Sequence, residues 1–238
     1  IRALGAHRWI NFGLFIVQPA ELAKLVLVLY LSAWFSVQEK KRLGAFFLLT
    51  SVLFGLVILE PDLGTGIIIL ALSLIMYFLS GATIKHFLIL VPIIIVGVVI
   101  LAVSSPYRFA RLTTYLNPES DPLGASYQIR QVLISLGSGG FTGIGIGKSR
   151  QKYEYLPEAN TDSIFAIIGE EVGFVGTFFV VSTFVFFVWR AFHIAVHAPD
   201  AFGRLLASGI ASWVGIQSIL NIGAMAALIP LTGIPLPL

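Results

Sequence analysis

The chain has 238 residues, of which 57% are hydrophobic and 11% charged, and its mean hydropathy is +0.93. Such a chain cannot present a polar exterior to water, so the composition excludes a soluble globular domain and indicates an integral membrane protein. The sequence contains no cysteine, which excludes disulfides and thiolate metal sites. A dispersed net charge of +3 gives no support for nucleic-acid binding.

Six long apolar segments follow one another along the sequence, at residues 17–36, 43–59, 63–81, 86–104, 163–189 and 205–230. A hydrocarbon core about 30 Å thick requires roughly 20 apolar residues per helical span. Because backbone polar groups inside lipid must be satisfied within each span, these segments predict helices. The expected fold class is all-α, a polytopic transmembrane helix bundle with about six spans in a single membrane domain over residues 1–238.

Basic residues in the short connections set the predicted orientation. Six Lys and Arg residues lie at positions 39–42, 85 and 190–204, and two lie in the leading segment. The positive-inside rule places the first group in the cytoplasm. The polar stretch at residues 105–162 then becomes one large extracellular loop, although its own basic residues would reverse the tally if all were counted.

This loop contains an amphipathic pattern followed by a glycine-rich run. Apolar residues at 129, 132, 133 and 136 predict a short helix over residues 127–136 with Ser126 as its N-cap. Such a helix would lie on the membrane or plug a groove, and packing onto the bundle is an equal alternative. The glycines between 137 and 147 predict an irregular passage. They fit no P-loop, because Thr142 replaces a required glycine, and no dinucleotide fingerprint.

Charged side chains also occur inside or between the apolar segments. Glu21 and Lys24 stand three positions apart, so they form either a structural ion pair or the lining of a polar cavity. Asp62 lies in a turn, where capping of the next helix is its simplest role. Glu170 and Glu171 are adjacent acids two turns into a span, so they need protonation or partners.

The densest charge lies at the end of the loop, where Lys148, Arg150 and Lys152 precede Glu154, Glu158 and Asp162. Basic side chains at a lipid surface suit a phosphate or diphosphate headgroup. A carboxylate at the mouth of a helix, within reach of such a cluster, suits a general base acting on a sugar hydroxyl. Spacing alone nevertheless favours a solvated loop that ends in a helix N-cap.

Several short blocks are spread through the whole chain: QPAELAK at 18–24, EPDLGT at 60–65, YQ at 127–128, GSGG at 137–140, QK at 151–152, LPEANTD at 156–162, NIG at 221–223 and PLTG at 230–233. In order and spacing they resemble blocks of the SEDS family (shape, elongation, division and sporulation). The stretches at 143–152 and 169–171 resemble the division members more than the elongation members.

The resemblance implies a ten-span membrane glycosyltransferase that polymerises lipid II, the undecaprenyl-diphosphate-linked disaccharide pentapeptide, into peptidoglycan at the outer face of the bacterial plasma membrane. Residues 105–162 correspond to the family's large extracellular loop. A class B penicillin-binding protein transpeptidase and other division proteins are the implied partners, and the division septum is the implied location. About three leading spans and the final span are missing, so we expect a fragment whose own activity stays open.

The resemblance also implies roles for individual residues. The family's essential acid matches Asp162, the expected general base, which takes a proton from the acceptor's GlcNAc 4-hydroxyl during inverting transfer. The substrate cavity is expected to include Glu21, Lys24, Asp62 and Glu158. The candidates for stabilising the leaving diphosphate are Arg108, Arg111, Lys148, Arg150 and Lys152. No cofactor is certain, although a divalent cation, Mg or Mn, would serve the same purpose.

Two alternatives remain from the residues themselves. A lipid II flippase would use Glu21, Lys24, Glu170 and Glu171 as its polar path, but the charge is concentrated in one outer loop instead. A non-catalytic scaffold that positions a transpeptidase is the second alternative. Asn160 stands where the family usually has histidine, so we assign that position no acid or base role.

Overall fold

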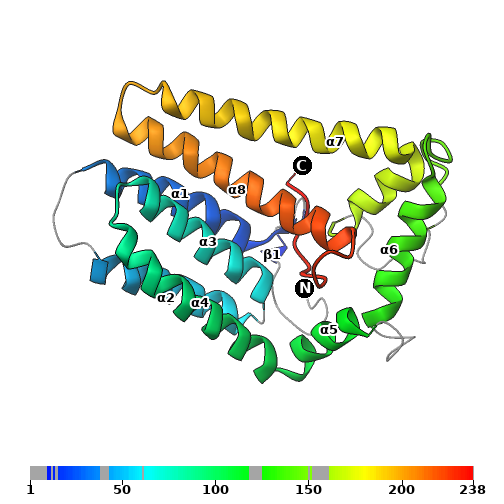
Figure 1. The fold of residues 1–238 in the computed structure, drawn as a ribbon, viewed down its shortest axis with the longest axis horizontal. Coiled ribbons are helices and arrows are strands. Elements are labelled where there is room, and N and C mark those ends of the chain that lie inside the picture. The colour runs from blue at the N-terminus through cyan, green and yellow to red at the C-terminus, as the bar shows by residue number, and fades with distance from the viewer. Residues whose placement is uncertain are drawn as a thin grey trace. The chain divides into compact units, whose positions relative to one another are not determined.

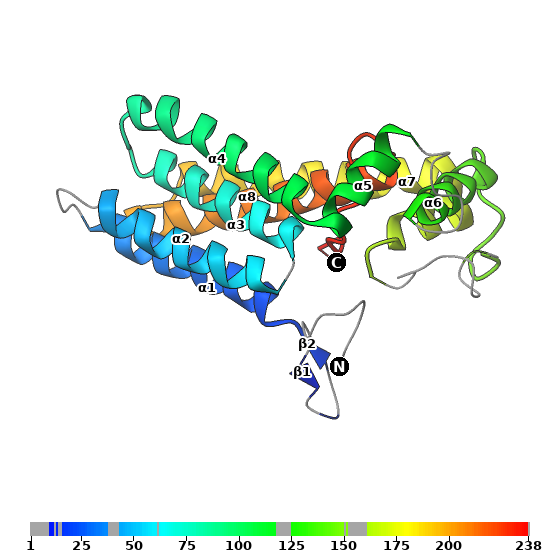
Figure 2. The same ribbon diagram turned by 90° about the horizontal axis from the view of Figure 1, so that it is seen from below.

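A computed structural model describes residues 10–11, 13, 16–37, 43–60, 62–117, 125–149, 151 and 161–237. Its helices are α1 (Pro19–Ser36), α2 (Leu43–Leu59), α3 (Leu63–Leu79), α4 (Ile84–Ser104), α5 (Pro106–Leu116), α6 (Ala125–Gly139), α7 (Ile164–Val196) and α8 (Ala201–Met225) (Figure 1). Two short strands, β1 (Ile10–Asn11) and β2 (Ile16–Val17), pair antiparallel before α1 (Figure 2).

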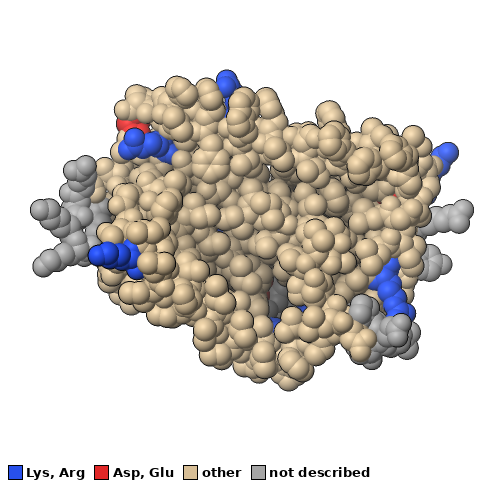
Figure 3. All heavy atoms as spheres, viewed as in Figure 1, with Lys and Arg blue, Asp and Glu red and all other residues tan. Residues whose placement is uncertain are grey.

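Six of these helices coincide with the six apolar segments, which confirms the predicted helical membrane fold. Helices α1, α4, α7 and α8 are long and apolar enough to cross a membrane, whereas α2 and α3 are apolar but have 17 residues each. The molecular face drawn in Figure 3 is almost entirely uncharged. This distribution suits helices whose outer sides contact lipid.

The ends of two spans and the content of the loop differ from expectation. Helix α7 continues to Val196 and α8 already begins at Ala201, so much of the basic connection is helical. The described part of the loop contains two helices, whereas one was predicted: α5 was not expected, and α6 is longer than residues 127–136. Ser126 lies inside α6, so its predicted capping role is wrong. Its hydroxyl is buried and has no hydrogen-bond partner within the described part of the chain.

The chain forms two compact units. The first comprises residues 1–91 and 187–216, and the second comprises residues 92–186 and 217–238. The core of the first unit is made by side chains of α1, α2 and α3 together with Leu205 of α8. Gly209 permits close packing there, since a Cβ atom at this position would lie 2.7 Å from both Met76 Sδ and Val28 Cγ1.

The second unit has a separate core, and this core positions the mouth of α7. Ile129 and Val132 of α6 pack with Phe165 and Ala166 at the start of α7. The same cluster includes buried residues of the end of α8 and of the segment that follows it, namely Ala224, Met225, Leu231 and Leu236. Apolar packing therefore holds the loop helix α6 and the C-terminal segment against the start of α7.

Candidate functional site

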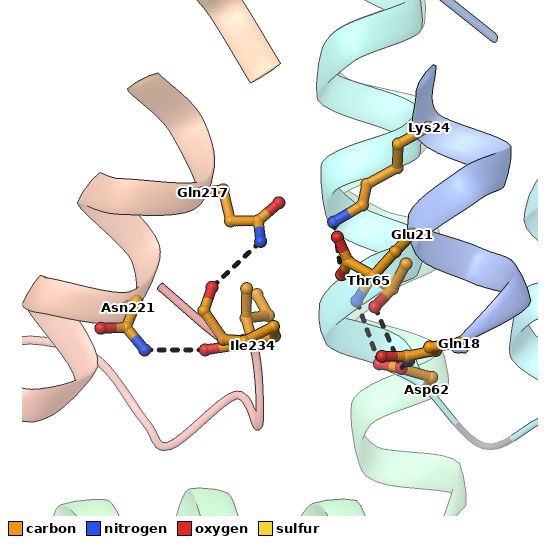
Figure 4. A network of polar contacts seen from close by, with 9 residues as sticks. Gln18, Glu21, Lys24, Asp62, Thr65, Gln217, Asn221 and Ile234 are labelled. Atoms are coloured by element: carbon orange, nitrogen blue, oxygen red, sulfur yellow. Dashed lines mark hydrogen bonds and ion pairs between the residues drawn. The ribbon is translucent and has the colours of Figure 1, made fainter. Parts of the chain in front are cut away.

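Asp162 lies two residues before the start of α7, and its backbone is held by a side chain from α8. The Nδ2 atom of Asn221 donates hydrogen bonds to the carbonyl oxygens of Asp162 and Ile234, each 2.7 Å long (Figure 4 shows the bond to Ile234). An amide nitrogen carries two hydrogens, so one side chain can make both bonds. Asn221 is buried, whereas Asp162 is partly exposed. The acid therefore has a fixed backbone and an accessible side chain.

The residues around the Asp162 carboxylate include one of the predicted cations. A Cβ atom placed on Gly233 would lie 3.4 Å from Asp162 Oδ2 and 3.6 Å from Arg111 Nη1. The carboxylate and the guanidinium thus border the same point next to the C-terminal segment. Gly233 has a φ of +70°, which favours glycine, and a methyl group at this position would be in van der Waals contact with both groups. We call Arg111, Asp162, Asn221 and Gly233 the acid site.

Helix α5 is attached to the C-terminal segment by two side chains on one side of the helix. Arg111 Nη1 donates to the carbonyl oxygen of Leu231 over 3.0 Å, and Tyr115 Oη donates to that of Leu228 over 2.7 Å. Arg108 instead donates to the carbonyl oxygen of Leu101 near the end of α4, over 3.3 Å. This contact is the usual stabilisation of a helix C-terminus by a cation.

The remaining basic candidates have different settings. Lys148 is exposed at the end of the glycine-rich run. Arg150, Lys152 and Glu158 lie outside the described residues. Of the five predicted diphosphate ligands, the structure therefore places Arg111 beside Asp162. The roles assigned to all five stay predictions.

In the first unit, Lys24 and Glu21 form the ion pair that their spacing allowed. Lys24 Nζ lies 2.7 Å from Glu21 Oε1 and 5.5 Å from the centre of the Trp213 ring (Figure 4 shows the ion pair). The Lys24 side chain is fully buried, whereas 29% of the Glu21 side chain is exposed. A buried ammonium requires such a partner, because an uncompensated charge in this setting is strongly destabilising.

Asp62 is the N-cap of α3, as its position in the turn predicted. Its carboxylate accepts hydrogen bonds from Thr65 N and Thr65 Oγ1, each 3.0 Å long, and from Gln18 Nε2 over 3.4 Å (Figure 4). Asp62 is only 4% exposed. Its visible role is to join the start of α1 to the start of α3, while the expected role in a substrate cavity stays a prediction.

Sequence reasoning missed the residues that fix the acid site. Asn221 belonged to a recognised block but had no assigned role, and Gln217, whose Nε2 donates to Pro235 O over 3.0 Å, was not singled out (Figure 4). The available signal was two amide side chains four positions apart in an apolar helix. Such a pair lies on one face and needs polar partners inside a membrane protein.

Apolar helices of membrane-spanning length, with a charged site where a loop helix meets the mouth of a span, define a polytopic helical membrane protein. The FtsW/RodA/SpoVE profile of cell cycle proteins matches residues 1–238, so the chain belongs to this family.

Individual relatives extend over almost the whole chain. Stage V sporulation protein E of Bacillus subtilis is 44% identical over 98% of this chain and 65% of its own length. The probable peptidoglycan glycosyltransferase FtsW of Thioalkalivibrio sulfidiphilus is 39% identical over 98% and 61%. The chain thus spans less than two thirds of the length of these relatives.

Solved structures show the same fold. A chain of a peptidoglycan synthase complex that coordinates polymerization and crosslinking superposes with a TM-score of 0.76 at 28% identity, over 100% of this chain and 68% of that chain. The rod shape determining protein RodA of Thermus thermophilus gives a TM-score of 0.64 at 26% identity, over 100% and 63%.

Proposed function

We propose that this chain carries the catalytic site of a peptidoglycan glycosyltransferase that polymerises lipid II at the outer face of the plasma membrane. The observation that carries the proposal is the approach of Asp162 and Arg111 to the same side of Gly233. FtsW relatives named as probable peptidoglycan glycosyltransferases, at about 40% identity, supply the reaction class. The chain spans 61–65% of the length of the two relatives compared above, so the activity is proposed for a protein of their full length.

In the proposed reaction Asp162 is the general base. It accepts the proton of the acceptor's GlcNAc 4-hydroxyl while that oxygen forms a bond to the anomeric carbon of the donor's MurNAc. The bond from that carbon to the diphosphate oxygen breaks, and its electron pair leaves with undecaprenyl diphosphate. A single carboxylate that acts on the acceptor, without a covalent nucleophile, predicts inversion at the anomeric carbon.

Arg111 is the proposed ligand of the leaving diphosphate. Its Nη1 already donates to Leu231 O, which orients the guanidinium. A guanidinium has five N–H donors in a planar fork, a geometry that matches phosphate oxygens. Arg108, Lys148, Arg150 and Lys152 are further candidates, and Glu21, Lys24, Asp62 and Glu158 are proposed to shape the substrate cavity.

A divalent cation is compatible with this site only as a partner of the substrate. The described residues contain no group of three or more His, Asp or Glu side chains that could hold a metal. Mg²⁺ commonly binds through one or two carboxylates together with substrate phosphates. Asp162 would be the protein ligand, and the ion would help to neutralise the diphosphate charge.

We also propose the partners and the setting. The solved peptidoglycan synthase complex supports a transpeptidase of the class B penicillin-binding type as partner. FtsW relatives match at 37–40% identity and the RodA structure at 26%, which supports a division role at the septum. The sporulation relative at 44% identity indicates spore formation as the alternative setting of the same chemistry.

The test uses the full-length protein reconstituted with purified lipid II, with glycan products resolved by length. We expect polymer from the wild type and none from Asp162→Asn, which keeps the size of the side chain but cannot accept the proton. Asp200→Asn is the matched control, because Asp200 caps α8 through Gly203 N at 2.7 Å and belongs to the other unit. Equal polymer from Asp162→Asn and wild type would overturn the role of Asp162. No polymer under any condition, with translocation of labelled lipid intact, would favour the flippase.

A further inference from the structure

Helix α7 is broken at Gly173, whose φ of 69° and ψ of −163° are not helical. A break of this kind leaves carbonyl groups before it and N–H groups after it without partners in the helix. Residues 140–145, which we call the glycine strap, supply those partners. The bonds run from Ile144 N to Glu170 O, from Gly145 N to Glu171 O, from Phe174 N to Gly140 O and from Val175 N to Phe141 O, at 3.0, 3.0, 2.9 and 3.2 Å.

The strap and the broken helix are in direct backbone contact. A Cβ atom at Gly139, the last residue of α6 before the strap, would collide with the carbonyl of Gly169, and one at Gly143 within the strap with the carbonyl of Glu171. Glycine is therefore required for this approach, since any side chain would push the two backbones apart. The first part of α7, residues 164–172, is thus fixed to the strap by its backbone.

A buried carboxylate adds a side-chain connection at the same place. Glu170 is 3% exposed, and its Oε2 accepts a hydrogen bond of 2.5 Å from Ser149 Oγ. It also lies 3.4 Å from Ser135 Oγ of α6, which donates to Ala166 O over 2.9 Å. Both serines are buried. Glu170 consequently joins the end of the glycine-rich run to α7 at a point where α6 also contacts that helix.

The same short piece of helix carries the acid site at its other end. Asp162 precedes α7 and is held there by Asn221, whereas Glu170 lies six residues, or about 9 Å of helix, beyond Ile164. Ser149 immediately follows Lys148 in the sequence. The residue next to Lys148 is therefore anchored to the same short piece of helix that Asp162 precedes.

We propose that Glu170 is a positioning residue for glycosyl transfer: by holding Ser149, it keeps the neighbouring Lys148 in register with Asp162. This inference rests on the proposed function, because Lys148 has to meet the diphosphate while Asp162 meets the acceptor hydroxyl. Glu170 touches neither substrate nor the reacting atoms in this scheme. A shift of Lys148 by about 1 Å is enough to lower the rate by up to a hundredfold.

The experiment is a double-mutant cycle in the full-length protein, with lipid II polymerisation measured at saturating and subsaturating substrate. We expect Glu170→Ala and Ser149→Ala each to lower kcat by about tenfold, and the double variant to be no slower than the slower single variant, because the contact between Glu170 and Ser149 is lost in all three. Ser138→Ala is the matched serine control and should leave kcat unchanged, since among the described residues Ser138 Oγ donates to Ser135 O within its own helix. Glu170→Gln retains an oxygen that accepts from Ser149, so it should recover most of the activity lost in Glu170→Ala.

The possible results separate this inference from the proposed function. Independent, multiplying losses in the double variant would overturn it, as would a Glu170→Gln variant as slow as Glu170→Ala. If Glu170→Ala does not fold, as judged by its melting temperature, Ser149→Ala decides: normal kcat in that variant overturns the proposal. A wild type that polymerises lipid II through Asp162, with Ser149→Ala and Glu170→Ala unchanged, would leave the proposed function intact and remove the positioning role.

Discussion

The side-chain amide of Asn221 donates a hydrogen bond of 2.7 Å to the backbone carbonyl oxygen of Asp162, 59 positions earlier in the chain. The same nitrogen bonds to Ile234 O over 2.7 Å, so one buried amide joins the mouth of α7 to the C-terminal segment. Because both acceptors are backbone atoms, the contact fixes where Asp162 stands without occupying its carboxylate. The proposed base is thereby preorganised by a residue that takes no part in proton transfer.

Replacement of Asn221 by alanine tests this arrangement. Two carbonyl groups lose their donor, at a cost of about 1–3 kcal/mol for each buried group left unsatisfied. We expect Asn221→Ala to lower kcat for lipid II polymerisation by at least about tenfold, because Asp162 is no longer held. Asn221→Asp should be no better than alanine, since a carboxylate cannot donate to either carbonyl. Wild-type kcat in Asn221→Asp would contradict the hydrogen-bond explanation.

Gly233 offers a test of whether substrate approaches between the carboxylate of Asp162 and the guanidinium of Arg111. Alanine at this position would adopt a strained φ of +70° and place a methyl group 3.4 Å from Asp162 Oδ2 and 3.6 Å from Arg111 Nη1. We expect Gly233→Ala to abolish most polymerisation, with a loss of stability of about 1 kcal/mol or somewhat more.

The control for Gly233→Ala is Gly223→Ala in α8, where the new methyl group would meet Ile229 Cγ1 at an ordinary 3.6 Å. A helical alanine at that position should be neutral or stabilising by up to about 1 kcal/mol. Steady-state kinetics and thermal melting of both variants provide the comparison. Equal activity of the two would show that the space beside Asp162 is not used by substrate.

Substitutions of Arg111 test whether polymerisation requires a planar cation at this position. Lysine preserves the charge but lacks the planar fork of donors that can hydrogen-bond to Leu231 O and to a phosphate at the same time. Arg111→Lys should therefore keep part of the activity, and Arg111→Ala should keep less. We expect kcat to fall by about ten- to a hundredfold in Arg111→Ala, in line with the loss of one electrostatic ligand of a developing charge. Arg130→Ala, at an exposed position of α6, is the matched control and should retain activity. A similar loss in both variants would indicate a general effect of net charge.

The membrane helices were predictable because span length and hydropathy are local properties of the sequence. Helix α5 was missed since its polar residues, Arg108 and Arg111 among them, break the apolar signal, and each of these arginines donates to a carbonyl oxygen of another segment. The break at Gly173 was likewise not predictable, because membrane helices tolerate glycine and the break depends on backbone partners in the glycine strap. The acid site combines residues distant in sequence, which no local pattern can bring together.

The last prediction separates the two roles that the sequence left open for Glu21 and Lys24. Glu21→Ala leaves a buried ammonium without its partner 2.7 Å away, which should cost about 3–5 kcal/mol and lower the melting temperature sharply. The double variant Glu21→Gln with Lys24→Met removes both charges, so stability should return, because a buried pair replaced by uncharged side chains is often neutral. Since 29% of the Glu21 side chain is exposed, we expect this stable double variant to remain defective in polymerisation. Wild-type polymerisation by the double variant would instead show that the pair serves only to neutralise itself within the bundle.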